Sequence, residues 1–286
     1  GITAANKVYD GLTLATLSGS ASLGGVLGSD SVSVAGSAVG AFADKNVGTN
    51  KAILVSGLNL SGADAANYTV GALSATADIT AKALTVAYTA SNKVYDATTA
   101  ATVSGSSSDV LGSDVVTFSQ SAAFGDKNVG TGKTVNVTGI SLGGTDAGNY
   151  SLQNTTASTT ADISRASLSV TGASASNKVY DATTAATVSG GTVAALGSDS
   201  VNLSGANATF ANKNVGTGKT VTTAYTLSGT DAGNYTLVQP SGMLADITPA
   251  SLSVTGASAA NKVYDGSDSA TVSGGSVTAL GSDSVT

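Results

Sequence analysis

Cysteine, histidine, tryptophan and glutamate are all missing from this chain of 286 residues, which holds only 2 prolines and 1 methionine. Without cysteine, the chain has neither disulfides nor thiolate metal sites. Without histidine it also lacks the side chain that most often serves as a general base. Few groups therefore remain for catalysis, and only a Ser–Lys or paired-aspartate site stays open on composition.

Charge is scarce as well. Charged residues make up 10% of the chain, and the formal net charge is −6. A surface that binds phosphate groups needs clustered lysine and arginine, so we expect no nucleic-acid partner. No run of 18 apolar residues occurs, and we therefore expect no membrane insertion in this segment.

The residues that are plentiful favour β-structure. Alanine, serine, threonine, valine and glycine dominate, and all 18 acidic residues are aspartate. Threonine and valine favour strands, whereas aspartate, glycine and asparagine favour turns. The composition thus predicts an all-β protein. Its core must be built mostly from small side chains, because only 9 Tyr and 4 Phe supply bulk.

An internal repeat decides the organisation of the chain. The motif Asn-Lys-Val-Tyr-Asp occurs four times, and four other motifs recur in phase with it. The first motif occupies Asn6–Asp10, Asn92–Asp96, Asn177–Asp181 and Asn261–Asp265; Leu-Gly-Ser-Asp ends at Asp30, Asp114, Asp199 and Asp283; Lys-Asn-Val-Gly-Thr starts at Lys45, Lys127 and Lys213; Asp-Ala-x-Asn-Tyr ends at Tyr68, Tyr150 and Tyr235; and Ala-Asp-Ile ends at Ile79, Ile163 and Ile247.

These motifs divide the chain into four repeats. Repeat 1 covers residues 1–80 and lacks its first strand, repeat 2 covers 81–164, repeat 3 covers 165–248, and repeat 4 is cut off at 249–286. A unit of about 85 residues can bury a core of its own. We therefore expect beads on a string, and we expect the chain to be a piece of a longer one.

Alternating apolar residues predict about seven short strands in each repeat, with turns at the spacing of a sandwich or barrel. In the long strands of repeats 1 and 2 the alternation shifts by one residue at Gly57 and Gly139. An extra residue next to glycine indicates a β-bulge. Repeat 3 alternates without a break through Tyr225, so no bulge is expected there.

The repeats follow one another without a flexible linker. Only four residues separate Ile79 from Leu84, and the other junctions are equally short, with Pro249 stiffening the last. Glycine/serine spacers would allow wide reorientation, but such short junctions do not. The sequence therefore predicts a semi-rigid, extended rod.

The motif that ends at Tyr68, Tyr150 and Tyr235 resembles the tyrosine corner of immunoglobulin-like sandwiches. In that corner the tyrosine hydroxyl bonds to the backbone a few residues upstream. We therefore expect tandem immunoglobulin-like β-sandwiches. The alternative is a β-grasp-like repeat, in which residues Asp146–Tyr150 would form a helix.

Asn-Lys-Val-Tyr-Asp, together with Ala-Asp-Ile and Lys-Asn-Val-Gly-Thr, resembles the YDG repeat of large bacterial surface and secreted adhesins, including filamentous-haemagglutinin-like exoproteins. This resemblance covers essentially the whole chain and implies a stalk-like role at the cell surface, with no catalytic residues to transfer. The glycine that gives the repeat its name is present as Gly11 and Gly266, but Ala97 and Ala182 replace it elsewhere. Because alanine resists a positive φ, we expect no such requirement at this position.

Three further site hypotheses are weaker than a structural interpretation. Aspartate-rich turns could hold calcium, whose ligands are oxygen atoms, but a lone aspartate in such a turn usually bonds its own backbone. The candidates are Asp30, Asp114 and Asp199 with Asp10, Asp96 and Asp181. The lysine of Asn-Lys-Val-Tyr-Asp is expected in a salt bridge or in solvent, with an isopeptide bond as the alternative. Gly130–Thr134 fails as a P-loop, because Lys127 stands where glycine is required.

These observations favour a non-catalytic stalk or spacer of a bacterial extracellular adhesin, which projects a distal binding region. An enzyme would not be expected to repeat its site every 85 residues, and no metal or cofactor is expected. The expected partners are the neighbouring repeats, with self-association through exposed strand edges as a further hypothesis. The alternative function is that the repeats themselves bind a glycan or a protein.

Overall fold

The computed structural model describes residues 1–285, which form 26 strands and three 3₁₀ turns, and the all-β prediction is confirmed. Among these residues, no helix has the length and hydrophobicity required to cross a bilayer. The chain groups into two compact units. Unit 1 comprises Gly1–Asn92, Thr99–Asp126 and Gly132–Asp162, and unit 2 comprises Lys93–Thr98, Lys127–Thr131 and Ile163–Thr286.

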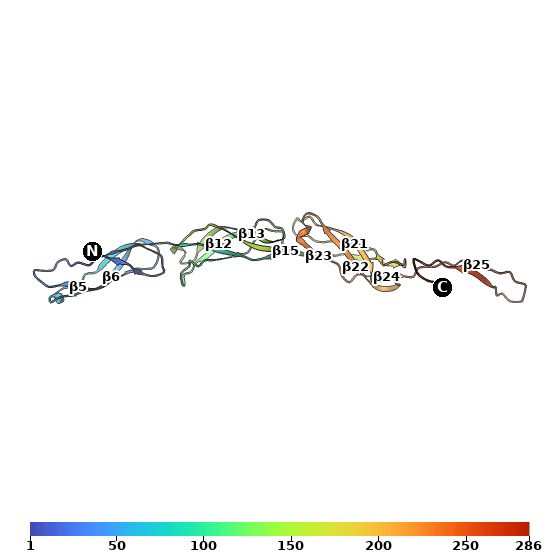
Figure 1. Ribbon diagram of the computed structural model, residues 1–286, viewed down its shortest axis with the longest axis horizontal. Helices are drawn as coiled ribbons and strands as arrows, with labels where there is room; N and C mark the ends of the chain where they lie inside the picture. The colour runs from blue at the N-terminus through green and yellow to red at the C-terminus, as the bar shows by residue number, and fades with distance from the viewer. Residues whose placement is uncertain (286) are drawn as a thin grey trace. The chain divides into compact units, whose positions relative to one another are not determined.

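Most strands have five residues or fewer, and the longest strand in each complete repeat has 13 or 14. Figure 1 shows the strands as arrows. Repeat 1 contains β1 (Thr3–Ala4), β2 (Lys7–Val8), β3 (Leu14–Ala15), β4 (Leu17–Ser18), β5 (Ser33–Phe42), β6 (Gly48–Ser61), η1 (Ala65–Asn67) and β7 (Leu73–Thr80). Repeat 2 contains β8 (Lys82–Leu84), β9 (Ala87–Ala90), β10 (Lys93–Val94), β11 (Val103–Ser106), β12 (Thr117–Phe124), β13 (Gly130–Gly143), η2 (Ala147–Asn149), β14 (Tyr150–Leu152) and β15 (Thr156–Ser164).

The last two repeats continue the same order. Repeat 3 contains β16 (Ala166–Ser169), β17 (Ser174–Ala175), β18 (Lys178–Val179), β19 (Ala185–Ala186), β20 (Val188–Ser189), β21 (Asn202–Phe210), β22 (Gly216–Ser228), η3 (Ala232–Asn234), β23 (Tyr235–Val238) and β24 (Leu244–Thr248). Repeat 4 contributes β25 (Thr255–Ala259) and β26 (Val272–Ser276), which pair as an antiparallel hairpin.

One main sheet recurs in each complete repeat. Its strand order is β2-β7-β6-β5-β3 in repeat 1 and β18-β24-β22-β21-β19 in repeat 3, and repeat 2 has the four-stranded order β10-β15-β13-β12. The long strands pair antiparallel, whereas β2 joins β7 in parallel. The first strand of repeats 2 and 3 lies outside this sheet: β8 pairs in parallel with β14, and β16 with β23.

Alternate side chains of the long strands form the core, as the pleat requires. In repeat 1, Ile53 on β6 and Ile79 on β7 are completely buried beside Phe42. Each fully buried isoleucine stabilises the fold by roughly 1.5–3 kcal/mol. The same apolar cluster of unit 1 also includes Ile140 and Tyr150 of repeat 2. The two repeats therefore share a core, and they are less independent than beads on a string.

The predicted bulges lie in the long strand pairs. Along β12 and β13 the register shifts after Ser119, so that Gly139 and Ile140 together lie opposite Gln120. Gly139 has φ +65°, and this confirms the bulge predicted there. Gly57, with φ +82°, also lies at a register shift, but the two-residue side of that bulge belongs to the partner strand β5.

The prediction of an unbroken ladder in repeat 3 is wrong. The register of β21 and β22 shifts between Ser204 and Asn207, which leaves Gly205 and Ala206 opposite Tyr225. The extra residue lies in β21, and the alternation in β22 therefore stays regular. The sequence pattern of one strand cannot reveal a bulge that its partner carries.

The expectation that no positive φ is required at the position of Gly11, Ala97 and Ala182 is also wrong. Gly11 has φ +78°, and Ala97 and Ala182, which replace it, have φ +64° and +63°. The preceding Asp96 explains this, because its carboxylate accepts the N–H of Thr98 at 2.9 Å and closes a turn around Ala97. A left-handed alanine costs about 1–2 kcal/mol. Repeats 2 and 3 tolerate this strain.

Residues Asp146–Tyr150, which would form a helix in a β-grasp-like repeat but not in an immunoglobulin-like sandwich, contain only a short turn. Residues Ala147–Asn149 form a single 3₁₀ turn, and Ala65–Asn67 and Ala232–Asn234 do the same in their repeats. A β-grasp-like repeat would place a helix here. The turn delivers the tyrosine that follows it to the junction described next.

Candidate functional site: the junction between repeats

The Leu-Gly-Ser-Asp motif is a tight turn that presents a carboxylate. In repeat 2 the N–H of Asp114 bonds to the carbonyl of Leu111 at 2.9 Å, and Gly112 has φ +46°. The side chain of Asp114 is only 4% exposed, and that of its counterpart Asp199 is fully buried. Burying a charge is costly unless the charge is paired and hydrogen-bonded, so each aspartate needs several donors.

Three donors reach Asp114, two of them from repeat 1. The hydroxyls of Tyr9 and Tyr150 each donate to Oδ2 at 2.7 Å, and Lys45 Nζ donates to Oδ1 at 2.6 Å. Tyr9 belongs to Asn-Lys-Val-Tyr-Asp and Lys45 to Lys-Asn-Val-Gly-Thr, whereas Tyr150 lies in repeat 2. This arrangement, within unit 1, links repeat 1 to repeat 2.

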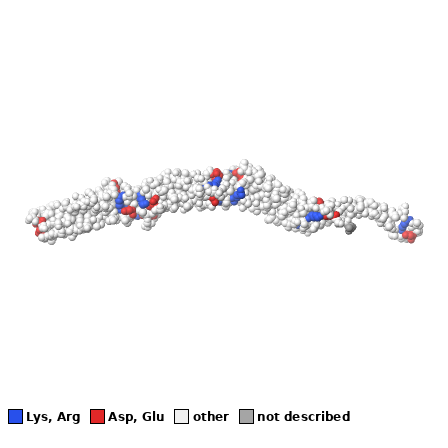
Figure 2. All heavy atoms as spheres, viewed as in Figure 1, with Lys and Arg blue, Asp and Glu red and all other residues white. Residues whose placement is uncertain are grey.

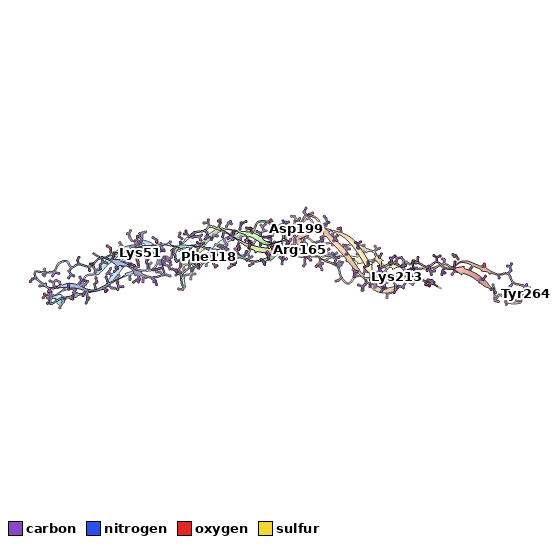
Figure 3. All side chains as sticks on the ribbon, viewed as in Figure 1. Lys51, Phe118, Arg165, Asp199, Lys213 and Tyr264 are labelled. Atoms are coloured by element: carbon purple, nitrogen blue, oxygen red, sulfur yellow. The ribbon has the colours of Figure 1, made fainter. Side chains whose placement is uncertain are left out.

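The cluster recurs within unit 2. Tyr95 and Tyr235 each donate to Oδ2 of Asp199 at 2.7 Å, and Lys127 donates to Oδ1. Lys127 Nζ also lies 3.2 Å from Oδ1 of Asp231. Figure 3 labels Asp199 among its neighbouring side chains. The same donors occupy equivalent positions in both junctions, which indicates that neighbouring repeats of this kind join through the same contacts.

The aromatic rings of each cluster pack edge to face. The centroids of Tyr9 and Tyr150 are 5.5 Å apart with an interplanar angle of 74°, and those of Tyr95 and Tyr235 are 5.4 Å apart at 78°. Such pairs contribute about 0.5–1.5 kcal/mol beyond burial. Lys45 Nζ lies 5.7 Å from the Tyr9 centroid, within cation–π range.

A buried asparagine completes each junction. Asn149 accepts the N–H of Val47 at 2.9 Å and donates to Asn46 Oδ1 at 3.2 Å. Asn234 contacts Val129 and Asn128 in the same way at the same distances. The Lys-Asn-Val-Gly-Thr motif therefore presents its lysine, asparagine and valine backbone to the Asp-Ala-x-Asn-Tyr motif of the following repeat.

Electrostatics keep the junction aspartates ionised. Burial alone would raise the pKa of Asp114, but hydrogen bonds from Lys45, Tyr150 and Tyr9 outweigh burial and lower it. The same balance lowers the pKa of Asp199. Burial and the adjacent carboxylate raise the pKa of Tyr150 to about 12, and that of Tyr235 to about 12. The clusters therefore consist of a carboxylate, an ammonium group and two neutral phenols.

The first and last copies of the turn differ from these two. The Asp283 carboxylate accepts hydrogen bonds from the Tyr180 hydroxyl and from Lys213 Nζ, the latter at 2.5 Å. Asp30 receives Tyr68 at 2.7 Å, and no lysine among residues 1–285 forms an ion pair with it. Asp30 is therefore a natural reference for what the full cluster adds.

The rest of Asn-Lys-Val-Tyr-Asp fastens each repeat internally. The Asn6 side chain accepts the N–H of Asp78 at 2.8 Å, and the Asp78 carboxylate accepts the N–H of Asn50. Lys7 Nζ bonds to Asp10 at 2.8 Å and to the carbonyl of Leu12 at 2.7 Å. The expected salt bridge of this lysine is confirmed. Its partner aspartate is half exposed.

The same contacts recur in repeat 3. Lys178, together with the N–H and hydroxyl of Thr183, lowers the pKa of Asp181 to about 2. In Figure 2, basic and acidic atoms lie next to one another in small groups separated by uncharged surface. Other ion pairs lie outside these two kinds of cluster, such as Lys51 with Asp44 and Lys133 with Asp126, each at 2.6 Å.

The aspartates considered as calcium ligands were expected to lie near one another within a repeat, but Asp114 of repeat 2 lies beside Asp10 of repeat 1. Asp10 shares a hollow with Lys45 and with Asp114 of the following repeat. A calcium site gathers oxygen acceptors around a cation. The junction does the reverse, since it gathers N–H and O–H donors around a carboxylate. Among residues 1–285 no group of three or more candidate metal ligands is found.

The tyrosine-corner expectation requires a correction. The Tyr150 hydroxyl accepts a backbone N–H from Leu111, 39 residues upstream, instead of one a few residues upstream. Tyr235 does the same with Leu196. The reason is that the tyrosine points toward the Leu-Gly-Ser-Asp turn at the junction. Tyr9, Tyr95, Lys45 and Lys127 were not expected to contact these turns.

Sequence comparison gives the family. The YDG domain model matches residues 1–77, 80–159, 164–242 and 248–286, and the chain therefore belongs to the YDG domain family. A search of curated proteins finds no match to the chain.

Proposed function

We propose that the chain is a non-catalytic spacer, a tandem array of YDG repeats that carries a distal binding region away from the surface of a bacterium. The observation that supports this most strongly is the repeated junction. Asp114 and Asp199 each join two repeats through the same two tyrosines and one lysine. Such a device limits movement between neighbouring repeats. A spacer needs this property, and a catalyst does not.

The energetics favour a stiff junction. The carboxylates are buried and receive three donors each, and the clusters combine ion pairing, hydrogen bonds and ring packing. A fully satisfied buried polar cluster rigidifies its surroundings, because partial separation leaves costly unpaired groups. We propose that repeats joined in this way form an extended rod.

We propose an immunoglobulin-like sandwich as the finer fold of each repeat. The main sheet is antiparallel over its long strands, and the short pairs β9–β11 and β8–β14 lie outside it. A parallel partner at one edge, as β2 is to β7, is compatible with this arrangement. The adhesin role and the extracellular location rest on the resemblance of Asn-Lys-Val-Tyr-Asp, Ala-Asp-Ile and Lys-Asn-Val-Gly-Thr to the motifs of adhesin repeats.

The alternative, in which the repeats bind a glycan or protein themselves, would use exposed aromatic side chains. Six of the nine tyrosines are instead engaged in the turn clusters, from Tyr9 to Tyr235. Tyr264 is the strongly exposed one, at 93% (Figure 3). We therefore favour the spacer.

Repeat number should determine reach. We expect a binding domain displayed on one, two or three repeats to capture a ligand buried in a polymer layer with an efficiency that rises with each added repeat. Charged substitutions at exposed Ser74 and Thr76 serve as controls and should leave capture unchanged. Capture that depends on a surface substitution, with the fold intact and repeat number irrelevant, would favour the binding-module alternative.

A further inference from the structure

The outer face of the main sheet in repeat 1 carries exposed leucine and valine side chains. Leu14 on β3, Ala41 on β5 and Leu54 on β6 lie directly opposite one another, so their side chains share one face. Val39 lies two residues before Ala41 and Ala52 two before Leu54, which places both on that face. Leu14 is 63% exposed, Val39 50% and Leu54 65%. We call this set the outer patch: Leu14, Val39, Ala41, Ala52 and Leu54.

The large side chains of the outer patch are specific to repeat 1. The pairing of β12 with β13 and of β21 with β22 identifies the residues that occupy the same positions in the other two complete repeats. At the positions of Leu14, Val39 and Leu54 these are Ala100, Ser121 and Asn136 in repeat 2, and Ala185, Asn207 and Thr222 in repeat 3. The fold is therefore compatible with small or polar side chains at these positions, and it does not require the apolar ones of repeat 1.

Neighbouring repeats leave this face uncovered. Repeat 2 stands between repeats 1 and 3 in the chain, and Ala100, Ser121 and Asn136 are nevertheless exposed. A repeat with a neighbour on each side thus keeps these positions in contact with solvent. The exposure of the outer patch is therefore a property of the sheet face and does not depend on what adjoins repeat 1.

The outer patch is held in place and is uncharged. Lys7 Nζ donates to the carbonyl oxygen of Leu14 at 3.0 Å, which fixes β3 beside the sheet. Lys7 is also paired with Asp10, and Lys51 with Asp44, so these charges are compensated within repeat 1. A charged partner surface would lose its hydration on the patch without gaining an opposite charge. The patch therefore favours a partner that is apolar, uncharged and flat.

We propose that the outer patch binds the outer patch of a second copy of this chain, face to face. Two packed sheets lie about 10 Å apart, and interdigitating side chains from both faces fill the space between them. The patch combines large and small side chains, since Leu14 and Leu54 flank Ala41. The leucines of one copy can therefore occupy the space above Ala41 and Ala52 of the other, which makes the patch complementary to itself.

The contact is isologous, because both copies use the same surface, and it therefore closes at a dimer. A stable interface involves about 20–30 residues and about 800 Å² on each partner. The outer patch is several times smaller, so the dimer should be weak and reversible. This inference does not depend on the proposed spacer function. It also differs from association through strand edges, which does not stop at two copies.

Sedimentation equilibrium of the complete chain, from low micromolar to millimolar concentration, tests the proposal. We expect a monomer of 27.3 kDa at low concentration and a dimer at high concentration. Leu54→Asp should weaken the dimer by about tenfold or more, because it buries a charge in an apolar contact. Leu54→Asn gives repeat 1 the residue that repeat 2 has, and it should weaken the dimer without affecting the fold. The control is Asn136→Asp at the equivalent position of repeat 2, which should have no effect.

Two outcomes of this measurement overturn the proposal. One is a chain that stays monomeric at every concentration. The other is association that both Leu54 variants leave unchanged, which would indicate a contact elsewhere, such as a strand edge.

Disulfide trapping examines the contact directly, because the chain has no cysteine of its own. Ala41→Cys places one thiol in the middle of the patch, where two copies come close together. Thr209→Cys is the control, at the equivalent exposed position of repeat 3. Under the same mild oxidant, Ala41→Cys should form the linked dimer about tenfold faster, and adding Leu54→Asp should remove this difference. Equal rates for the two cysteine variants overturn the proposal.

Discussion

Asp199→Ala is expected to destabilise the junction between repeats 2 and 3 by about 3–5 kcal/mol, the range for breaking a buried ion pair by removing one partner. The substitution removes the acceptor of three hydrogen bonds, from Tyr95, Tyr235 and Lys127. The two phenols then remain in the interface without their acceptor. Lys127 retains Asp231 at 3.2 Å and partial access to water, which keeps the loss at the lower end.

A matched control exists in the chain. Asp30 occupies the same turn in repeat 1, but among residues 1–285 its carboxylate accepts a side-chain hydrogen bond from Tyr68 alone, so Asp30→Ala should have a much smaller effect. Because a chain of several repeats need not unfold in one step, local opening is the better readout. Hydrogen exchange of the Leu196 amide, which bonds to Tyr235, should accelerate strongly in Asp199→Ala. Equal effects of the two substitutions would contradict the role of the cluster.

Acid is expected to release the junctions in a defined pH window. The pKa values of Asp114 and Asp199 in the folded chain lie below the ordinary value of 3.8. A carboxylate with a lowered pKa contributes stability above its unfolded pKa, and this stability is lost as the pH falls through the folded pKa. Stability should therefore fall below about pH 4. Without histidine, it should change little between pH 5 and 8.

The alkaline side has its own window. The pKa values of Tyr150 and Tyr235 are raised to about 12, so their contribution is complete below about pH 10 and is lost as the pH rises toward 12. The measurement is the unfolding midpoint from pH 2 to 12. The double variant Asp114→Asn/Asp199→Asn should be less stable at neutral pH and should lose less on acidification. Parallel acid limbs for the two proteins would show that other aspartates control the transition.

The sequence predicts the periodic part of the structure well. Alternating apolar residues place the long strands, because a sheet with one buried face imposes a period of two. The glycine at a phase shift correctly indicates the bulge at Gly139. The five motifs correctly identify the residues that matter. Every one of them forms a turn, a fastening within a repeat or a junction between repeats.

The partners of these motifs could not be predicted in the same way. Each repeat carries the same tyrosine, lysine and aspartate, and nothing in the sequence says whether Tyr9 bonds to Asp30 in its own repeat or to Asp114 in the next. The structure chooses the second, over a separation of 105 residues. One feature of the sequence does indicate these contacts. The lysines and aspartates are few and recur at fixed positions in each repeat, which indicates that they pair with one another.

The positive φ of Ala97 is a second feature that the sequence did not predict. Alanine at position 97 argued against a positive φ, yet φ is +64°. Lys93 and Thr98 both bond to the carboxylate of Asp96, and together these contacts impose the turn. The left-handed conformation of alanine costs about 1–2 kcal/mol, and several hydrogen bonds acting together offset this cost.

We propose that the junction clusters hold successive repeats in an extended array. The long strands β6 and β13 have 14 residues each and so span roughly 45 Å at about 3.3 Å per residue. Three repeats placed end to end would then approach about 135 Å, and a rod of that length has a radius of gyration of about 40 Å.

Small-angle X-ray scattering from proteins of one, two and three complete repeats measures this quantity directly. Our account predicts a radius of gyration that rises in proportion to repeat number and approaches about 40 Å for three repeats. A compact domain the length of the whole chain would have a radius of about 19 Å. A value near 19 Å for three repeats, or one that barely rises when a repeat is added, would contradict the account.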